Sequence, residues 1–305
     1  MMDAFRLVGI GEVLWDLLPS GRQLGGAPAN FAYHARALGA DGRIISRVGR
    51  DANGGEIIAR LEQLGIPTDC IEIDPTAPTG TVSVGVSADG QPHYTIHQNV
   101  AWDHLAGEQN ARRAVESAEA VCFGTLAQRS ETSRNGIRKL LALTKPNCLR
   151  ILDVNLRQQF YSKELIKQSL ELATVLKVND NELPHIAELL GITGDTRTQL
   201  AKIAERFSLR TVACTRGDRG SLLLHEKNWS DHPGVPTKVA DTIGAGDAFT
   251  AAMTLGLLAG WDLDKVNEEA NRVAAYVASR SGGTPRLPDD LRTRFRQNNL
   301  KGTNK

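Results

Sequence analysis

The strongest constraint on how this chain folds is an alternation of short apolar segments with helical segments along most of its length. The segments with the composition of buried strands are residues 7–11, 43–48, 120–123, 150–154, 175–178 and 211–214. Helical patterns lie between them, and one of these spans residues 28–38 and ends at Gly39. Repeated strand–helix units predict an α/β fold in which helices cover both faces of a parallel sheet. Such sheets bind ligands beyond the carboxyl ends of their strands.

Residues 79–98 depart from this alternation. Two segments with alternating polar and apolar residues lie on either side of residues 88–91, Ala-Asp-Gly-Gln, which predicts a β-hairpin. Residues 13–18 could supply another strand beside it. We therefore expect a small β-sheet, built from about residues 12–25 and 78–102, that projects from the body and closes over a reaction centre. An additional edge hairpin without a function is the alternative.

Charge and cysteine content exclude several classes of protein. The 305 residues include 36 Lys+Arg and 35 Asp+Glu, a net charge of +1, so no excess positive charge is available to hold nucleic acid or a membrane surface. No apolar run is long enough to span a bilayer, and no signal-peptide pattern occurs. The scattered cysteines are predicted to be reduced core residues of a cytoplasmic protein. We expect one domain over residues 1–297 and a disordered tail at residues 298–305.

The most specific motif is Asp-Thr-Ile-Gly-Ala-Gly-Asp-Ala-Phe at residues 241–249. Gly244 and Gly246 allow a tight turn, and the small and apolar residues 245–258 predict a buried helix after it. The turn would deliver a helix N-terminus, whose free N–H groups form an anion site. Beside that site, the Asp247 carboxylate could take a proton from a hydroxyl while the anion site binds a phosphoryl group. An acidic residue placed only by the helix dipole is the alternative reading of Asp247.

A second motif, Gly-Gly-Ala-Pro-Ala-Asn at residues 25–30, opens the predicted helix at residues 28–38. Its paired glycines let a small ligand approach the backbone, and Asn30 offers both a donor and an acceptor to a hydroxyl group. A loop with proline in the first helical turn is the alternative. The dinucleotide fingerprint fails, because Leu14 follows Gly9-Ile-Gly11 at the third glycine position, and no Walker phosphate loop occurs.

These motifs, with Asp153-Val-Asn-Leu-Arg157, Asn179-Asp-Asn-Glu182 and Thr215-Arg-Gly217, resemble the signatures of the ribokinase-like (PfkB) carbohydrate kinases. The resemblance extends from about residue 7 to residue 288, and residues 9–16 are most similar to fructokinases. It implies a Rossmann-like three-layer αβα body with a parallel sheet and a small β-sheet lid, so that residues 1–297 form a single ribokinase-like kinase domain.

The resemblance also assigns roles in sugar binding and phosphoryl transfer. The residues that match contacts to sugar hydroxyls are Asp16, Gly26 and Asn30, and Asp247 matches the catalytic base. The residues that match the anion hole for the transferring phosphoryl group are Gly244, Ala245 and Gly246. Arg157 matches a basic residue near the sugar and the γ-phosphate. Ile243 departs from the residue that many relatives carry at its position.

Further positions match nucleotide and cation contacts. The nucleotide-binding matches are Asn179, Thr215, Gly217 and Asn271. Glu182 matches a residue that organises hydrated Mg²⁺. Asp241 and Thr242, with the later loop at residues 278–284, match a K⁺ site beside the anion hole, because oxygen donors suit hard cations.

The function implied by the resemblance is ATP-dependent phosphorylation of a primary hydroxyl of a sugar, with fructose as the expected acceptor. ATP is the co-substrate, Mg²⁺ the cofactor and K⁺ a further candidate. Another acceptor, such as 2-keto-3-deoxygluconate, ribose or a nucleoside, is the alternative among kinases, although Gln98 and Asn99 near the lid favour a polar sugar. A non-catalytic sugar-binding regulator on the same scaffold is the alternative from a different class. The resemblance also suggests a homodimer that forms through the lid.

Overall fold

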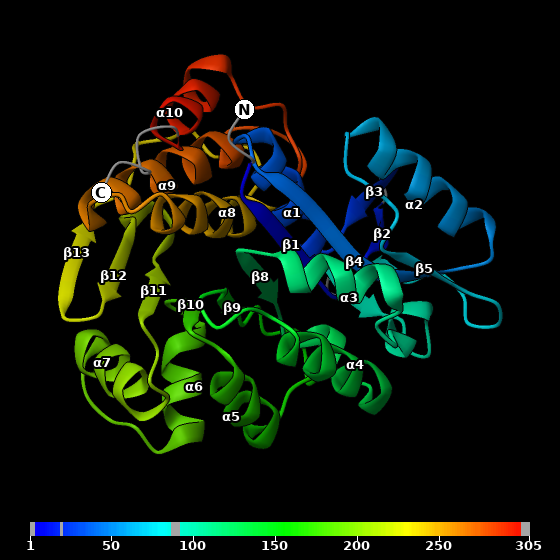
Figure 1. Ribbon diagram of the computed structural model, residues 1–305, viewed down its shortest axis with the longest axis horizontal. Coiled ribbons are helices and arrows are strands. Elements are labelled where there is room, and N and C mark those ends of the chain that lie inside the picture. The colour runs from blue at the N-terminus through cyan, green and yellow to red at the C-terminus, as the bar shows by residue number, and fades with distance from the viewer. Residues whose placement is uncertain (1–3, 19–20, 87–91, 300–305) are drawn as a thin grey trace.

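The computed structural model describes residues 4–18, 21–86 and 92–299 and contains two separate sheets (Figure 1). The central sheet has nine strands in the order β13-β12-β11-β10-β9-β8-β1-β4-β5. Their bounds are β1 Arg6–Ile10, β4 Asp41–Gly49, β5 Ile71–Asp74, β8 Ala120–Phe123, β9 Leu149–Asp153, β10 Val175–Asn179, β11 Thr211–Thr215, β12 Ser221–His225 and β13 Asn228–His232. Neighbours from β5 to β11 pair in parallel, whereas β12 and β13 are antiparallel. The predicted parallel α/β sheet is thus confirmed.

Helices cover both faces of this sheet (Figure 1). One face carries α1 Ala27–Ala37, α8 Ala245–Leu258, α9 Leu263–Ala278 and α10 Asp289–Asn299. The other carries α3 Gln109–Ser117, α4 Glu131–Ala142, α5 Lys163–Leu172, α6 Glu182–Leu190 and α7 Thr196–Arg206. Because successive strand residues point to opposite faces, Val175 of β10 joins the core under α8 and α9, while Leu176 joins the core under α5 and α6.

The second sheet is the predicted lid. It contains β2 Leu14–Leu18, β3 Gly21–Gly25, β6 Thr81–Val86 and β7 Pro92–Ile96, in the order β3-β2-β6-β7. The predicted hairpin is the antiparallel pair β6–β7, and residues 87–91 between these strands lie outside the described residues. Trp15 of β2 packs against α2 (Ala52–Gln63) and its indole N–H donates to the Asn53 carbonyl at 3.1 Å. Helix α2 therefore supports the lid through Trp15.

The sequence analysis predicts a tail at residues 298–305, and the last described helix runs two residues into that range. Helix α10 extends to Asn299, because Phe295 on the same helix is buried against Trp261 and anchors the last turns. Residues 300–305 lie outside the described part of the chain.

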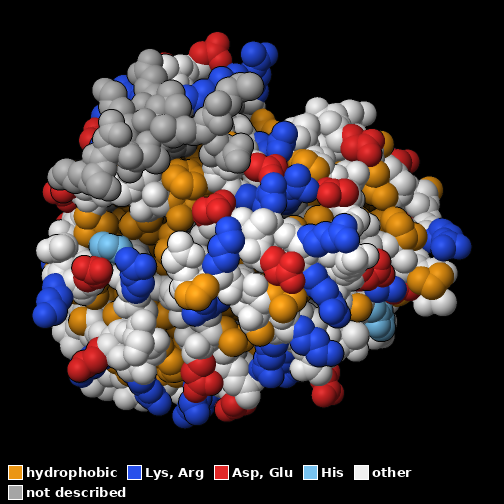
Figure 2. Space-filling view, in the orientation of Figure 1, with side chains coloured by type: hydrophobic (Ala, Val, Ile, Leu, Met, Phe, Trp, Pro, Cys, Tyr) orange, Lys and Arg blue, Asp and Glu red, His pale blue; other side chains and the backbone are white. Residues whose placement is uncertain are grey.

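The surface charge and the cysteines can be compared with what the sequence predicts. Figure 2 shows Lys and Arg side chains interspersed with Asp and Glu over the visible face. The four cysteines are buried and unpaired. Within residues 4–18, 21–86 and 92–299, no helix has the length and hydropathy needed to cross a membrane.

Helix α8 should contribute strongly to stability, because it is packed on nearly all sides. Leu255 is 0% exposed within it, whereas Leu143 after α4 is 39% exposed. We expect Leu255→Ala to lower the free energy of unfolding by about 2–5 kcal/mol and Leu143→Ala by less than about 0.5 kcal/mol. Urea denaturation of both variants measures the difference. Equal losses would contradict the placement of α8 in the core.

Candidate active site

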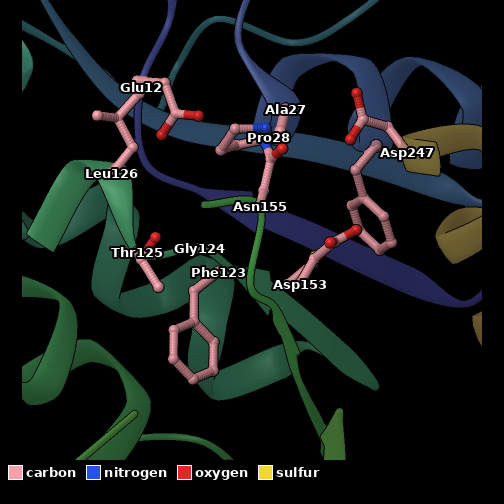
Figure 3. Close-up of a pocket in the computed structure, with 12 residues that line it drawn as sticks. Glu12, Ala27, Pro28, Phe123, Gly124, Thr125, Leu126, Asp153, Asn155 and Asp247 are labelled. Carbon is pink, nitrogen blue, oxygen red and sulfur yellow. The ribbon is translucent and has the colours of Figure 1, made fainter. Parts of the chain in front are cut away.

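A mostly apolar pocket that also contains three carboxylates lies at the carboxyl ends of β1, β8 and β9 (Figure 3). The residues around it are Glu12, Ala27, Pro28, Phe31, Cys122, Phe123, Gly124, Thr125, Leu126, Asp153, Asn155 and Asp247. Its free space is small, about 10 Å³ for the centre of a water molecule, which is the room of about one ordered water. In Figure 3, Glu12 and Asp247 flank this pocket from either side, with Asn155 between them.

Helix α8 presents Asp247 to the pocket. Gly244 is the residue before the helix and has the left-handed conformation, with φ of 75°. A side chain at Gly244 would put its Cβ 2.4 Å from the Gly283 carbonyl oxygen, so only glycine fits there. The helix begins at Ala245, as predicted, and Asp247 lies in its first turn. The amides of that turn and the Asp247 carboxyl therefore share one helix end.

Asp247 is held by a partner from a distant part of the chain. The Asn30 amide on α1 donates to the Asp247 carboxylate at 2.8 Å. Burial and, after it, the negative charge of Asp153 raise the pKa of Asp247, while the Asn30 hydrogen bond, Lys177 and Arg157 oppose them, so that the pKa is about 6. A carboxyl with a pKa close to neutrality is well matched to general base catalysis.

Two buried acceptor atoms near Asp247 have no hydrogen-bond donor among the described residues. They are Oε2 of Glu12, a side chain that is 4% exposed, and Oδ1 of Asn30. Burial raises the pKa of Glu12 to about 7, its own backbone amide opposes this, and Arg157 opposes it further. Buried acceptors are costly unless a donor reaches them, so both atoms fit a ligand that carries hydroxyl groups.

A buried ion pair is in contact with the glycine turn at residues 244–246. The Lys177 ammonium is 3.0 Å from Oδ1 of Asp153, and both side chains are buried. The Thr250 hydroxyl on α8 donates to Oδ2 of Asp153 at 2.8 Å. A Cβ built on Gly246 would be 3.0 Å from the Lys177 nitrogen, so the ammonium touches the turn that begins α8.

Glu182 connects two loops at the neighbouring strand ends. Its two carboxylate oxygens accept from the Leu156 amide and the Asn179 amide, each at 2.9 Å. The Asn179 side chain returns a bond by accepting from the Glu182 amide at 2.9 Å. Arg157 follows Leu156 and is exposed, and one nitrogen of its guanidinium donates to the Leu156 carbonyl at 3.2 Å. Each carboxylate oxygen retains a further lone pair, so Glu182 can also accept from a water molecule.

The lid supplies the remaining predicted acceptor contacts. Asp16 on β2 is half-buried, and burial raises its pKa while the charge of Arg157 lowers it. A Cβ on Gly25 would be 2.3 Å from the Asp16 carboxylate, and one on Gly26 would be 2.4 Å from the Glu12 carbonyl. Asp16 and Gly26 therefore lie against the junction of lid and body, next to Glu12. The Gln158 amide donates to the Tyr94 carbonyl of β7 at 2.6 Å and joins the Arg157 loop to the lid.

The predicted nucleotide contacts lie farther along the sheet. Thr215 ends β11 and is the register partner of Asn179 at the end of β10, and Gly217 follows with φ of 61°. Asn271 is 7% exposed on α9, and its amide nitrogen donates to the Ser221 hydroxyl at 2.7 Å and to the Asn267 carbonyl at 2.8 Å. That nitrogen is committed inside the protein, so Asn271 fits a nucleotide contact less well than the other three residues.

The loop that contains Asp241 is tied to the loop at residues 278–284. The Asp241 carboxylate accepts from the Ile243 amide at 3.0 Å and from the Gly282 amide at 2.9 Å, while the Asp241 amide donates to the Ala278 carbonyl at 3.2 Å. Thr242 precedes the turn, and its carbonyl accepts from the Ala245 amide at 3.3 Å. In the described part of the chain, no three His, Cys, Asp or Glu side chains form a metal cluster.

Sequence reasoning identified Asp247, Asn30, Gly244, Gly246 and Asp16, and the structure places them around one region. It assigned no role to Glu12, Asp153, Lys177 or Thr250. The available signal was a lysine inside an apolar strand segment, Val-Leu-Lys-Val at residues 175–178, which is unusual for a buried strand.

Comparisons with known proteins agree with this geometry. A family model described as pfkB family carbohydrate kinase matches residues 20–290. A protein of Pyrococcus horikoshii described as a putative sugar kinase is 30% identical, with 94% of this chain and 94% of the relative covered. A fructokinase of Klebsiella pneumoniae is 29% identical, with 92% of this chain and 96% of the relative covered.

Solved structures give the same result. An uncharacterized sugar kinase from Pyrococcus horikoshii superposes with a TM-score of 0.81 at 29% identity, over 96% of this chain and 99% of that chain. Its complex with ATP superposes with a TM-score of 0.78 at 30% identity, over 91% of this chain and 94% of that chain.

The raised pKa of Glu12 predicts a pH-dependent loss of stability. Burial lifts this pKa from 4.5 to about 7. The folded protein therefore holds its proton more tightly than the unfolded chain, and stability falls as the pH rises through this window. Glu12→Gln removes the loss, so we expect the variant to exceed the wild type by up to about 3 kcal/mol at pH 8 and to match it near pH 4.

Urea denaturation at the two pH values measures this effect, with the exposed Glu188→Gln as the matched control. If the free energy of unfolding differs between Glu12→Gln and the wild type by the same amount at both pH values, the pKa of Glu12 is not raised by burial.

Proposed function

The chain belongs to the pfkB family of carbohydrate kinases, and on that premise we propose that it transfers the γ-phosphoryl group of ATP to a primary hydroxyl of fructose. The observation that carries the proposal is the Asp247 carboxyl at the N-terminus of α8, with a pKa of about 6 and a fixed hydrogen bond from Asn30. The base and the anion site meet at one helix end. This arrangement matches a reaction that removes a proton from a hydroxyl while negative charge develops on phosphate.

Each residue of the site then has a defined task. Asp247 takes the proton of the acceptor hydroxyl as its oxygen attacks phosphorus, and the bond from phosphorus to the leaving oxygen of ADP breaks. The amides of Gly244, Ala245 and Gly246 would supply donors to the developing phosphoryl charge. Arg157 adds a positive charge that acts on the same region. Because these groups are fixed before the reaction, positioning and electrostatics supply most of the rate enhancement.

The donor set around Glu182 fits a hydrated Mg²⁺ rather than a directly bound ion. Both of its oxygens already accept a backbone amide, which leaves lone pairs for water ligands of the ion. When bound, Mg²⁺ neutralises phosphate charge. Asn179, Thr215 and Gly217 at the neighbouring strand ends would contact the nucleotide. The relative from Pyrococcus horikoshii that was solved with ATP supports the choice of nucleotide.

Fructose is the proposed acceptor because the site offers several hydroxyl contacts, and fructokinases are among the relatives that cover more than nine-tenths of this chain. Asp16, Glu12 and Asn30 supply carboxylate and amide oxygens on the acceptor side. A hydroxyl-rich sugar would satisfy the two buried acceptor atoms, whereas a nucleoside offers its hydroxyls only on the ribose. A non-catalytic regulator would not need a base at residue 247.

ADP release with a panel of D-fructose, 2-keto-3-deoxygluconate, D-ribose and adenosine tests the proposal. We expect the highest kcat/KM with D-fructose. Asp247→Asn keeps the shape of the side chain but cannot accept the proton, so kcat should fall about 10²–10⁴-fold.

The matched control is Asp264→Asn, an exposed residue in the first turn of α9, which should leave kcat unchanged. Near-normal turnover in a folded Asp247→Asn variant would refute the assignment of the base. A higher kcat/KM with another member of the panel would replace fructose as the acceptor.

A K⁺ ion beside the anion hole is a second part of the proposal. Asp241 and Thr242 would supply oxygen ligands, and the loop at residues 278–284 would supply carbonyl groups. The Asp241 carboxylate already joins the two loops through the Ile243 and Gly282 amides, so a cation there would reinforce the same connection and fix the turn before α8.

Replacing K⁺ with tetramethylammonium, at constant ionic strength and saturating Mg²⁺, should therefore lower kcat by roughly tenfold, which corresponds to about 1.4 kcal/mol. Restoring K⁺ should restore kcat, and activity that is unchanged by the exchange would show that the hydrogen bonds of Asp241 suffice.

A further inference from the structure

The buried ion pair of Asp153 and Lys177 has no task in the transfer described above. The two residues are register partners on the parallel strands β9 and β10, so the sheet itself holds their side chains together. Neither is more than about one-tenth exposed. Removing two charges from water is expensive, and apolar residues of similar volume often stabilise a protein core as well or better. The pair therefore needs an explanation beyond stability.

Its position connects it to the first turn of α8. Lys177 contacts Gly246, where a Cβ would be 3.0 Å from the ammonium. On the other side of the pair, the Thr250 hydroxyl lies 2.8 Å from Oδ2 of Asp153, to which its one proton is donated, and 3.0 Å from the Gly246 carbonyl oxygen. The pair thus contacts α8 on both sides of Asp247 in the sequence. Asp153 also lines the same pocket as Asp247.

We propose that Asp153 and Lys177 are positioning residues that act through Asp247: Lys177 keeps the base ionised between turnovers, and Asp153 keeps it basic enough to take the hydroxyl proton. The inference rests on the proposed role of Asp247 as the base. It assigns to the pair a function that neither residue could perform alone, because their effects on Asp247 oppose each other.

Electrostatics supports this division of tasks. The charged and titratable groups that face Asp247 are Glu12 after β1, Cys122 on β8, Asp153 on β9, Arg157 after β9 and Lys177 on β10. After burial itself, the charge of Asp153 is the largest influence that raises the pKa of Asp247, while Lys177 lowers it. Burial disfavours the charge of Lys177, but its pKa is nevertheless raised, because Asp153, Glu182 and Asp247 surround the ammonium. Lys177 therefore remains charged when the base titrates.

Single and double variants separate this role from a purely structural one. The measurement is the acid limb of the pH profile of kcat/KM, which reports the pKa of the base in the free enzyme. We expect Lys177→Met to move this limb up by about one pH unit or more and Asp153→Asn to move it down by about as much. The double variant should return to within about half a unit of the wild type, because both opposing charges are gone.

Thr250→Val is the matched control, because it removes the hydrogen bond to Asp153 without changing a charge. A structural effect would lower kcat/KM at every pH and leave the limb in place, as expected for this control. If Lys177→Met fails to fold because Asp153 is left unpaired, Asp153→Asn and the double variant still test the proposal. An unmoved limb in Asp153→Asn, or the same direction of movement in both single variants, would overturn it.

A second readout does not depend on the proposed function. Infrared difference titration of the ligand-free protein reports the carboxyl band that disappears in Asp247→Asn, whether or not any sugar is phosphorylated. The band should titrate at a higher pH in Lys177→Met and a lower pH in Asp153→Asn, each by about one unit. Opposite movements without kinase activity would support the pair and refute the kinase proposal. A band that does not move would refute the role of the pair, even if the sugar panel succeeds.

Discussion

The hydrogen bond from Asn30 to Asp247 joins two segments that are 217 residues apart in the sequence, and the rest of the site depends on it. It requires the first turns of α1 and α8 to lie side by side at the same edge of the sheet. That approach is possible because glycines lie at the closest contacts between the segments. A Cβ at Gly244 would meet the Gly283 carbonyl oxygen, and a Cβ at Gly283 would meet the Asn30 side-chain amide. The buried His34 ring secures the same loop through the Gly283 carbonyl at 2.9 Å. A lost glycine at these contacts would separate the base from its partner before it affected the core.

The site concentrates groups that oppose folding. Glu12 and Asp247 are buried carboxyls with raised pKa values, and Glu12 has an oxygen without a donor among the described residues. The surrounding layers offset this cost, since α8 is apolar along most of its length and its residues from Ala248 to Gly256 are buried. Stability and reactivity thus lie on the same helix: its middle stabilises the fold, and its first turn carries the destabilising group.

Much of the fold was predictable from the sequence, and the exceptions have physical reasons. The strands at residues 120–123 and, apart from Lys177, at residues 175–178 are apolar because helices cover both faces. Strand β3 was predicted only as part of the lid at residues 12–25, and β5, β12 and β13 were not predicted. Gly-Arg-Gln-Leu-Gly in β3 and Asn-Trp-Ser-Asp-His in β13 are polar sequences at sheet edges, which carry little strand signal of their own. The same limit applies to the site. Asp247 and Asn30 lie in specific motifs, but the meaning of Lys177 depends on Asp153 as its register partner, which no local pattern reveals.

The predicted sugar contacts and the predicted nucleotide contacts differ in how they are connected to the lid. Strand β2 leaves the body just after Glu12, and β3 returns at Gly25, directly before α1. Glu12 and Gly26 therefore lie where the lid joins the body, and Asp16 lies on the lid itself. Gly244, Asn179 and Thr215 belong to the central body. Any rotation of the lid would move Asp16 directly and the Arg157 loop through the hydrogen bond between Gln158 and Tyr94, whereas Gly244, Asn179 and Thr215 would stay with the body. The sugar would meet a surface that assembles as the lid moves, while the nucleotide would meet a rigid one.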